Sequence, residues 1–155
     1  MTNAFLYSVE REYDAPIAAL WQAWVDPAAL QIWYCPTQLS VLPGSVQNEA
    51  EVGGIWTVAV DVPEHSMVAY FFGKYTEVVP QVKLVHTMSF TVDAAEFAAR
   101  PVDAPEHDVV IDFEDRGGKS WVKFSQFGQL PEGEAPRAQA GMESYFDNLG
   151  AFLSR

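Results

Sequence analysis

His86 is the polar side chain whose position in the sequence is best suited to chemistry. It lies in an alternating run from Val82 to Val92, which predicts a strand with His86 among apolar residues on one face. A turn at Pro80-Gln81 would bring Tyr75 opposite His86. Burial lowers the pKa of a histidine and leaves a neutral imidazole that can donate or accept a hydrogen bond. Three roles stay open: a core histidine bonded to Tyr75 or to a backbone carbonyl, a group that orients a ligand, and a general base.

Two further polar side chains could support such a role. Glu77 is predicted near a strand end opposite Leu84, and it is the only carboxylate placed to orient a general base. Gln126 follows Phe124 on an inward-facing row. Its amide could contact a ligand, or it could bond to the backbone at the end of the strand.

The loops Val60–His65 and Val102–His107 have similar sequences that combine Asp, Pro, Glu and His. In an up-and-down meander both lie at the end of the sheet where Glu132 and Glu134 also fall. Paired His and Glu side chains could bind a divalent metal ion, but proline and acidic residues are also ordinary turn residues. We therefore predict an acidic rim, with no metal and no cofactor. Cys35 has no nearby base or cation in the sequence, so we expect a small, partly buried residue and not a catalytic thiol.

The C-terminal stretch Pro136–Arg155 is the element that would position these side chains. Its apolar residues recur at helical spacing, which predicts a helix with one buried face laid across a sheet. These residues are Met142, Tyr145, Phe146, Leu149, Phe152 and Leu153. Gly141 lies one turn before Tyr145 on the same face. With no side chain there, the helix leaves either a close backbone approach or an empty space.

The N-terminal part of the chain predicts one strand and two short helices. Ala4–Tyr13 is expected to be the strand. The apolar residues of Ile17–Val25 repeat at helical spacing. Asp26-Pro27 then caps and starts a second short helix, which ends by Pro36.

The middle of the chain predicts an antiparallel meander. Turns at Pro63–Ser66 and Pro80-Gln81 put three rows on one face of the sheet. The rows are Trp56/Val58/Val60, Phe71/Gly73/Tyr75 and His86/Met88/Phe90. A turn at Arg116-Gly117 would pair Ile111 with Val122 and Val109 with Phe124. The connection Asp93–His107 has no clear period and is either a mobile surface loop or a cover.

Size and charge limit the classes of function. A chain of 155 residues is expected to form one domain, here residues 1–155. No apolar run approaches the length of a membrane span, and no secretory signal is evident at the N-terminus, so we expect a cytoplasmic protein. The formal net charge of −12 argues against nucleic acid and anionic membrane surfaces as partners.

Residues spread over nearly the whole chain carry a family resemblance. They are Arg11-x-Tyr13-x-Ala15-Pro16, Trp21, Asp26-Pro27, Leu30, Trp33, Gly53-Gly54-x-Trp56, Gly73-x-Tyr75-x-Glu77-Val78-x-Pro80, Leu84-Val85-x-Thr87, Leu149 and Leu153. With them the sequence resembles the branch named after the activator of Hsp90 ATPase, within the START-like and Bet v 1-like helix-grip superfamily. The resemblance implies binding of small apolar molecules, a co-chaperone domain, or a cyclase or related enzyme.

We therefore predict an α+β helix-grip fold. A curved antiparallel sheet of about seven strands would wrap around the long C-terminal helix, with two short helices after the first strand. The predicted function is binding of a small hydrophobic or aromatic molecule between helix and sheet. The predicted ligand contacts are Trp56, Val58, Phe71, Tyr75, His86, Met88, Phe90, Phe124, Gln126, Tyr145, Phe146 and Leu149. The alternatives are a cyclase- or hydrolase-like enzyme that uses His86 with Tyr75, and an interaction domain that binds a chaperone or another protein.

Overall fold

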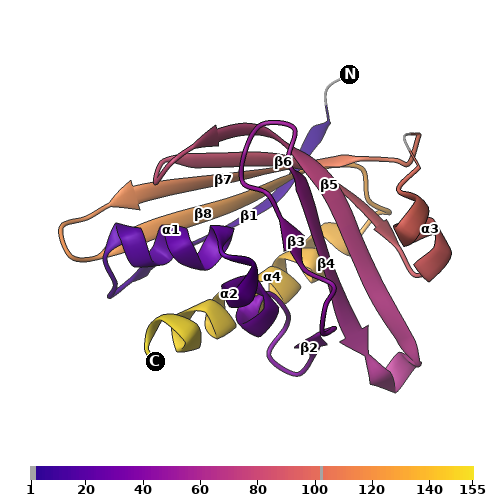
Figure 1. The fold of residues 1–155 in the computed structure, drawn as a ribbon, viewed down its shortest axis with the longest axis horizontal. Helices are drawn as coiled ribbons and strands as arrows, with labels where there is room; N and C mark the ends of the chain where they lie inside the picture. Colours follow the sequence, from indigo (N-terminus) through magenta and orange to yellow (C-terminus); the bar gives the residue numbers. More distant parts are fainter. Residues whose placement is uncertain (1–2, 102) are drawn as a thin grey trace.

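A curved antiparallel sheet surrounds one face of a long C-terminal helix in the computed structural model, which describes residues 3–101 and 103–155 (Figure 1). The strands are β1 Ala4–Tyr13, β2 Ser40–Val41, β3 Gln47–Asn48, β4 Ile55–Val62, β5 Met67–Val79, β6 Lys83–Thr91, β7 His107–Asp115 and β8 Ser120–Gly128. The helices are α1 Ile17–Val25, α2 Pro27–Trp33, the 3₁₀ turn Pro63–His65, α3 Ala94–Ala99 and α4 Glu134–Leu153. The strand order is β1-β8-β7-β6-β5-β4-β2, and β3 pairs with β4 beside this path. The predicted α+β helix-grip fold is confirmed.

The pairing of β4, β5 and β6 follows the predicted turns. Val58 pairs with Phe71, and Phe71 pairs with Phe90. Tyr75 lies opposite His86, as predicted. Because directly opposed residues share a face of the sheet, these strands present one continuous inner row toward α4.

A bulge in β5 changes the pairing near the turn to β6. The register shifts between Tyr75 and Glu77, so that Glu77 lies opposite Val85 and not opposite Leu84. A bulge adds an unpaired residue and bends the strand. The prediction that Glu77 faces Leu84 is therefore wrong, and the predicted orienting carboxylate for His86 is lost with it.

The turn between β7 and β8 is longer than predicted. Phe113 pairs with Val122 and Ile111 pairs with Phe124, which is two residues from the predicted register. The reason is a turn over residues 116–119, closed by a backbone hydrogen bond of 2.8 Å from Arg116 N to Lys119 O. A shift of two residues keeps every side chain on its predicted face, because side chains alternate with a period of two.

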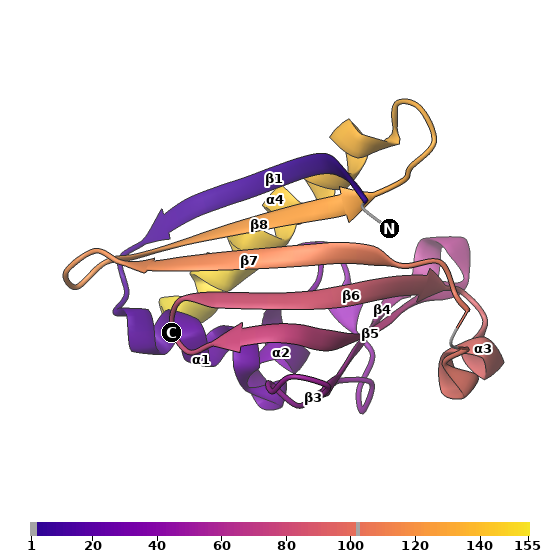
Figure 2. The same cartoon turned by 90° about the horizontal axis from the view of Figure 1, so that it is seen from above.

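Short helices close one end of the sheet, as predicted (Figure 2). The Asp26 side chain accepts a hydrogen bond of 3.0 Å from Ala28 N and caps α2. Trp24 and Trp33 pack edge to face with ring centroids 4.8 Å apart. The Trp33 indole also donates to the Ala23 carbonyl at 2.8 Å, which ties α2 to α1.

The connection Asp93–His107 contains α3, which periodicity did not predict. Asp93 caps this helix by accepting from Ala95 N at 2.9 Å. Phe97 stacks on Tyr70 with centroids 4.7 Å apart, on the face of β5 opposite to Phe71. The connection is therefore a cover on the outer face of the sheet. Residue 102, which begins the second His-containing loop of the sequence, lies outside the described residues.

Candidate ligand-binding site

A cavity of about 300 Å³ lies between α4 and the inner face of the sheet. Its wall consists of Tyr7, Tyr34, Pro36, Trp56, Phe71, Met88, Phe124, Gln126, Ala138, Gly141, Met142 and Tyr145. A Cβ atom built on Gly141 would meet nothing within 4 Å. Of the two alternatives for Gly141, the structure has the empty space and not the close backbone approach.

Four residues of α4 form the roof of the cavity because they share one helical face. Ala138, Gly141, Met142 and Tyr145 follow the i, i+3, i+4, i+7 spacing. Below them, β4 contributes Trp56, while β5, β6 and β8 contribute further apolar side chains. The pocket is therefore built from elements that are far apart in the chain.

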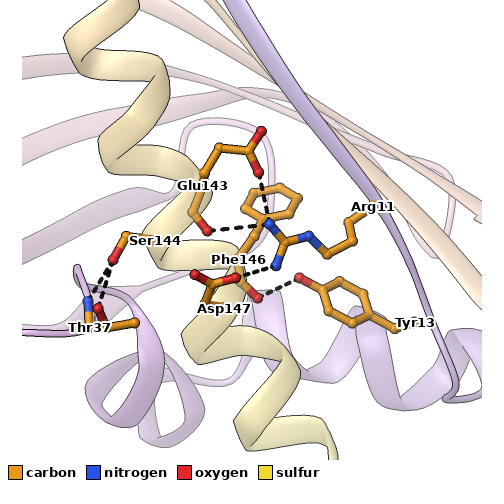
Figure 3. A network of polar contacts seen from close by, with 7 residues as sticks. All are labelled: Arg11, Tyr13, Thr37, Glu143, Ser144, Phe146 and Asp147. Carbon is orange, nitrogen blue, oxygen red and sulfur yellow. Dashed lines mark hydrogen bonds and ion pairs between the residues drawn. The ribbon is translucent and has the colours of Figure 1, made fainter.

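The C-terminal half of α4 is fastened to its neighbours by polar contacts (Figure 3). Arg11 of β1 donates to Glu143 Oε1 at 2.8 Å and to Asp147 Oδ1 at 2.7 Å. The Tyr13 hydroxyl donates to the Phe146 carbonyl at 2.7 Å. These contacts fix the helix one turn beyond Gly141, and so they set the distance between the cavity roof and the sheet.

The Ser144 hydroxyl extends this fastening to the segment after α2. It accepts a hydrogen bond of 2.8 Å from Thr37 N and donates to Thr37 Oγ1 at 3.1 Å (Figure 3). Asn148 donates to the Cys35 carbonyl at 2.8 Å. The segment that carries Tyr34 and Pro36 is thereby held against α4.

A chain of hydrogen bonds forms the polar edge of the cavity. The Tyr7 hydroxyl donates to Gln126 Oε1 at 2.6 Å, and Gln126 Nε2 donates to His107 Nδ1 at 2.7 Å. His107 Nε2 then donates to the Gln129 carbonyl at 3.1 Å. A Cβ atom on Gly128 would fall within 3 Å of three imidazole atoms, so the glycine makes room for the His107 ring. Gln126 therefore lines the cavity in a fixed orientation.

His86 is a core residue that does not line the cavity. Its side chain is 1% exposed, and its ring stacks on Trp56 with centroids 4.3 Å apart. Nδ1 lies 2.8 Å from the Thr87 carbonyl, which can only accept, so Nδ1 carries the proton of the neutral ring. Burial lowers the pKa of His86 to about 4. Of the partners considered for a core histidine, the backbone carbonyl is the one observed.

Tyr75 is also bonded within the protein. Its hydroxyl donates to Asn48 Oδ1 at 2.6 Å, and its ring meets His86 edge to face with centroids 5.6 Å apart. Neither Tyr75 nor His86 belongs to the cavity wall. The geometry brings the two rings together without directing either polar group at the cavity.

The predicted ligand contacts divide into two groups. Six line the cavity, namely Trp56, Phe71, Met88, Phe124, Gln126 and Tyr145. Five lie in the core outside the wall, namely Val58, Tyr75, His86, Phe146 and Leu149. Phe90 is 55% exposed and lies in an adjoining groove of about 340 Å³ that shares Phe71, Met88 and Gln126 with the cavity. The groove therefore borders the cavity at these three residues.

Six residues of the cavity wall were not predicted from the sequence. They are Tyr7, Tyr34, Pro36, Ala138, Gly141 and Met142. Gly141 and Met142 were placed on the correct helical face, so the helical period could have identified them. Tyr34 follows α2 in irregular backbone, where no periodicity indicates the direction of a side chain.

The described residues were also compared with the requirements of a metal site and of a membrane-spanning helix. Among residues 3–101 and 103–155, no group of three His, Cys, Asp or Glu side chains is placed to hold a metal ion. No helix of this part of the chain is long and apolar enough to cross a membrane.

Comparisons with known proteins agree with this architecture. Residues 14–154 match the family described as Activator of Hsp90 ATPase homolog 1-like protein. A crystal structure of a protein from Chromobacterium violaceum has a TM-score of 0.80 and 20% identity, with 96% of each chain covered. One from Silicibacter pomeroyi has a TM-score of 0.77 and 20% identity, also with 96% of each chain covered. A solution structure from Arthrobacter aurescens has a TM-score of 0.78 and 20% identity over 95% of this chain and 84% of that one. No curated protein matches the sequence.

Proposed function

This chain belongs to the Activator of Hsp90 ATPase homolog 1-like family, and from its cavity we propose that it binds a small apolar or aromatic molecule reversibly. The observation that carries the proposal is the open space beneath Gly141. A helix that served only to seal the sheet would fill this position with a side chain, since protein interiors pack closely. Here Gly141 leaves the space open, and aromatic rings, most of them from the sheet, surround it.

The chemistry of the wall suits an apolar ligand. None of the twelve lining residues carries a charge at neutral pH, and Gln126 is the only one with a side-chain amide. Small-molecule sites are concave and mostly apolar, with a few placed polar groups, and their volumes begin at about 300 Å³. The cavity is at this lower limit, which supports a ligand of one or two fused rings.

We propose that such a ligand enters from the groove beside Phe90, which borders the cavity. The exposed ring of Phe90 lines this groove together with Phe71 and Met88, which also belong to the cavity wall. The net charge of −12 makes the protein surface unfavourable for anions that approach this groove. Neutral ligands meet no such barrier.

Naphthalene is a suitable first probe because its size and lack of polar groups match the proposed site. We expect saturable binding to the wild-type protein in a calorimetric titration, which avoids the overlap between the fluorescence of naphthalene and that of the five tryptophans. Mass spectrometry of gently purified protein under native conditions would report any ligand that co-purifies. A saturable signal supports the proposal, and its absence at the solubility limit of naphthalene contradicts it.

Gly141→Leu tests whether binding occurs in this cavity. The leucine side chain would enter the open space, so we expect naphthalene binding to fall at least tenfold. Ala140→Leu is the matched control, because it adds the same side chain at the next position of α4, which is exposed. Equal affinities in the two variants would place any binding elsewhere and overturn the proposed site.

A further inference from the structure

Tyr34 and Tyr145 are buried tyrosines in the cavity wall whose hydroxyl groups have no hydrogen-bond partner within residues 3–101 and 103–155. Their side chains are 3% and 9% exposed. Their rings meet edge to face with centroids 5.1 Å apart. The two residues come from different elements, the end of α2 and the middle of α4, and both line the cavity.

The other buried tyrosines behave differently. Each of them donates its hydroxyl proton to a protein acceptor at a short distance. The bonds are Tyr7 to Gln126 Oε1 at 2.6 Å, Tyr13 to the Phe146 carbonyl at 2.7 Å, and Tyr75 to Asn48 Oδ1 at 2.6 Å. Buried polar groups in proteins are nearly always bonded, and each exception calls for an explanation. The fully buried side-chain atoms without a partner in the described residues are Trp24 Nε1 and Arg100 Nε, and neither residue lines the cavity. The hydroxyls of Tyr34 and Tyr145 differ from these because their residues border the open cavity, so the occupant of the cavity is their natural partner.

The protonation state of the two hydroxyls and the lack of charged residues in the wall determine which ligand atoms can bind there. Burial raises the pKa of Tyr34 and of Tyr145 well above the ordinary tyrosine value, so both remain protonated at physiological pH. Each can therefore donate a hydrogen bond to an acceptor atom. No lysine, arginine or histidine belongs to the cavity wall, so a buried carboxylate would find no opposite charge there.

We infer that the ligand is a neutral molecule whose apolar or aromatic body carries an acceptor oxygen, such as a ketone carbonyl, and that this oxygen binds Tyr34 and Tyr145. The inference rests on the proposed function and specifies its substrate class. In the free protein, water can satisfy the two hydroxyls. A ligand without an acceptor would displace that water and leave the hydroxyls unpaired, whereas a carbonyl oxygen replaces the lost bonds.

Three naphthalene probes separate shape from polarity. 2-Acetylnaphthalene carries a ketone, 2-isopropenylnaphthalene replaces its oxygen with a methylene group at nearly the same shape, and 2-naphthoate carries a negative charge. Calorimetric titration would give the dissociation constant of each probe for the wild-type protein and for Tyr34→Phe and Tyr145→Phe. Since neither hydroxyl bonds to the protein, phenylalanine preserves the packing. Tyr70→Phe, on the outer face of the sheet, is the matched control.

We expect each cavity substitution to weaken binding of the ketone about tenfold, the equivalent of one hydrogen bond. Binding of the alkene should not weaken and should become tighter, because phenylalanine leaves no hydroxyl unpaired beneath it. Tyr70→Phe should change neither. The naphthoate should bind at least tenfold more weakly than the ketone to the wild-type protein.

The probes also distinguish two kinds of failure. If neither the ketone nor the alkene binds, the proposed function itself is wrong. If both bind and the cavity substitutions leave the affinity of the ketone unchanged, ligand binding stands and the role of the two tyrosines is refuted. Naphthoate binding as tight as that of the ketone would refute the selection for a neutral ligand.

Discussion

Replacing Gly141 with alanine should stabilise the protein, although cavity-lining positions usually tolerate change poorly. Glycine in a helix interior is less favourable than alanine by about 1 kcal/mol. The new methyl group would meet nothing within 4 Å, so no steric cost offsets this gain. For a domain of this size, 1 kcal/mol corresponds to a rise in melting temperature of about 2–4 °C.

Gly150→Ala provides a control within the same helix. The change in helix propensity is of the same kind, but the added Cβ atom would lie 3.2 Å from Tyr13 Cε1. The Tyr13 ring is held by its hydrogen bond to the Phe146 carbonyl, so it can move away only by straining that bond. We therefore expect Gly150→Ala to be less stable than Gly141→Ala.

Urea unfolding followed by circular dichroism at 222 nm would measure both variants. Equal denaturant slopes would show that the comparison is one of stability alone. If Gly141→Ala instead lowers the free energy of unfolding by 1 kcal/mol or more, another group already occupies the space and the cavity beneath Gly141 does not exist.

Further predictions concern the groups around the cavity. Arg11→Met removes both ion pairs to α4, and because these charges are partly exposed, we expect a loss of only about 1 kcal/mol that shrinks in high salt during urea unfolding. His86 stays neutral in the folded state down to about pH 4, whereas the unfolded chain takes up this proton below about pH 6.5. Stability should therefore fall by up to about 3 kcal/mol between pH 6.5 and 4, and His86→Phe should lose this part of the pH dependence; identical profiles would contradict the burial of a neutral imidazole. Gly128→Ala should displace the His107 ring and weaken ligand binding without filling the cavity, as measured by calorimetry with 2-acetylnaphthalene; unchanged affinity would show that the ring has no part in orienting Gln126.

Periodicity and turn chemistry predicted the sheet and the long helix, because each depends on local patterns. The pairing of β4, β5 and β6 follows from two turns and one inward row, and it positions Phe71 and Tyr75 as expected. No sequence pattern indicates the bulge after Tyr75. One extra residue shifts the pairing of the strand, but the alternation of apolar residues is compatible with a strand that has the bulge and with one that lacks it. Glu77 was misplaced for this reason.

The cavity was harder to predict than the fold. The glycine at position 141 indicates that the apolar face of α4 lacks a side chain there. Whether the sheet backbone or an empty space faces this position depends on the distance between α4 and the sheet. That distance depends on Arg11 and Tyr13, which contact α4 from the far N-terminal end of the sequence. α3 was missed because its six residues are too few to establish a period, although Asp93 is an ordinary helix cap.

A crystal structure of the wild-type protein soaked with naphthalene would show whether the space beneath Gly141 accepts a ligand. We expect electron density for the ring system between Gly141 and Phe124, enclosed by Tyr34, Tyr145 and Met88. An unoccupied cavity filled by rearranged side chains, or naphthalene bound only in the groove between α2 and the C-terminal end of α4, would contradict this expectation.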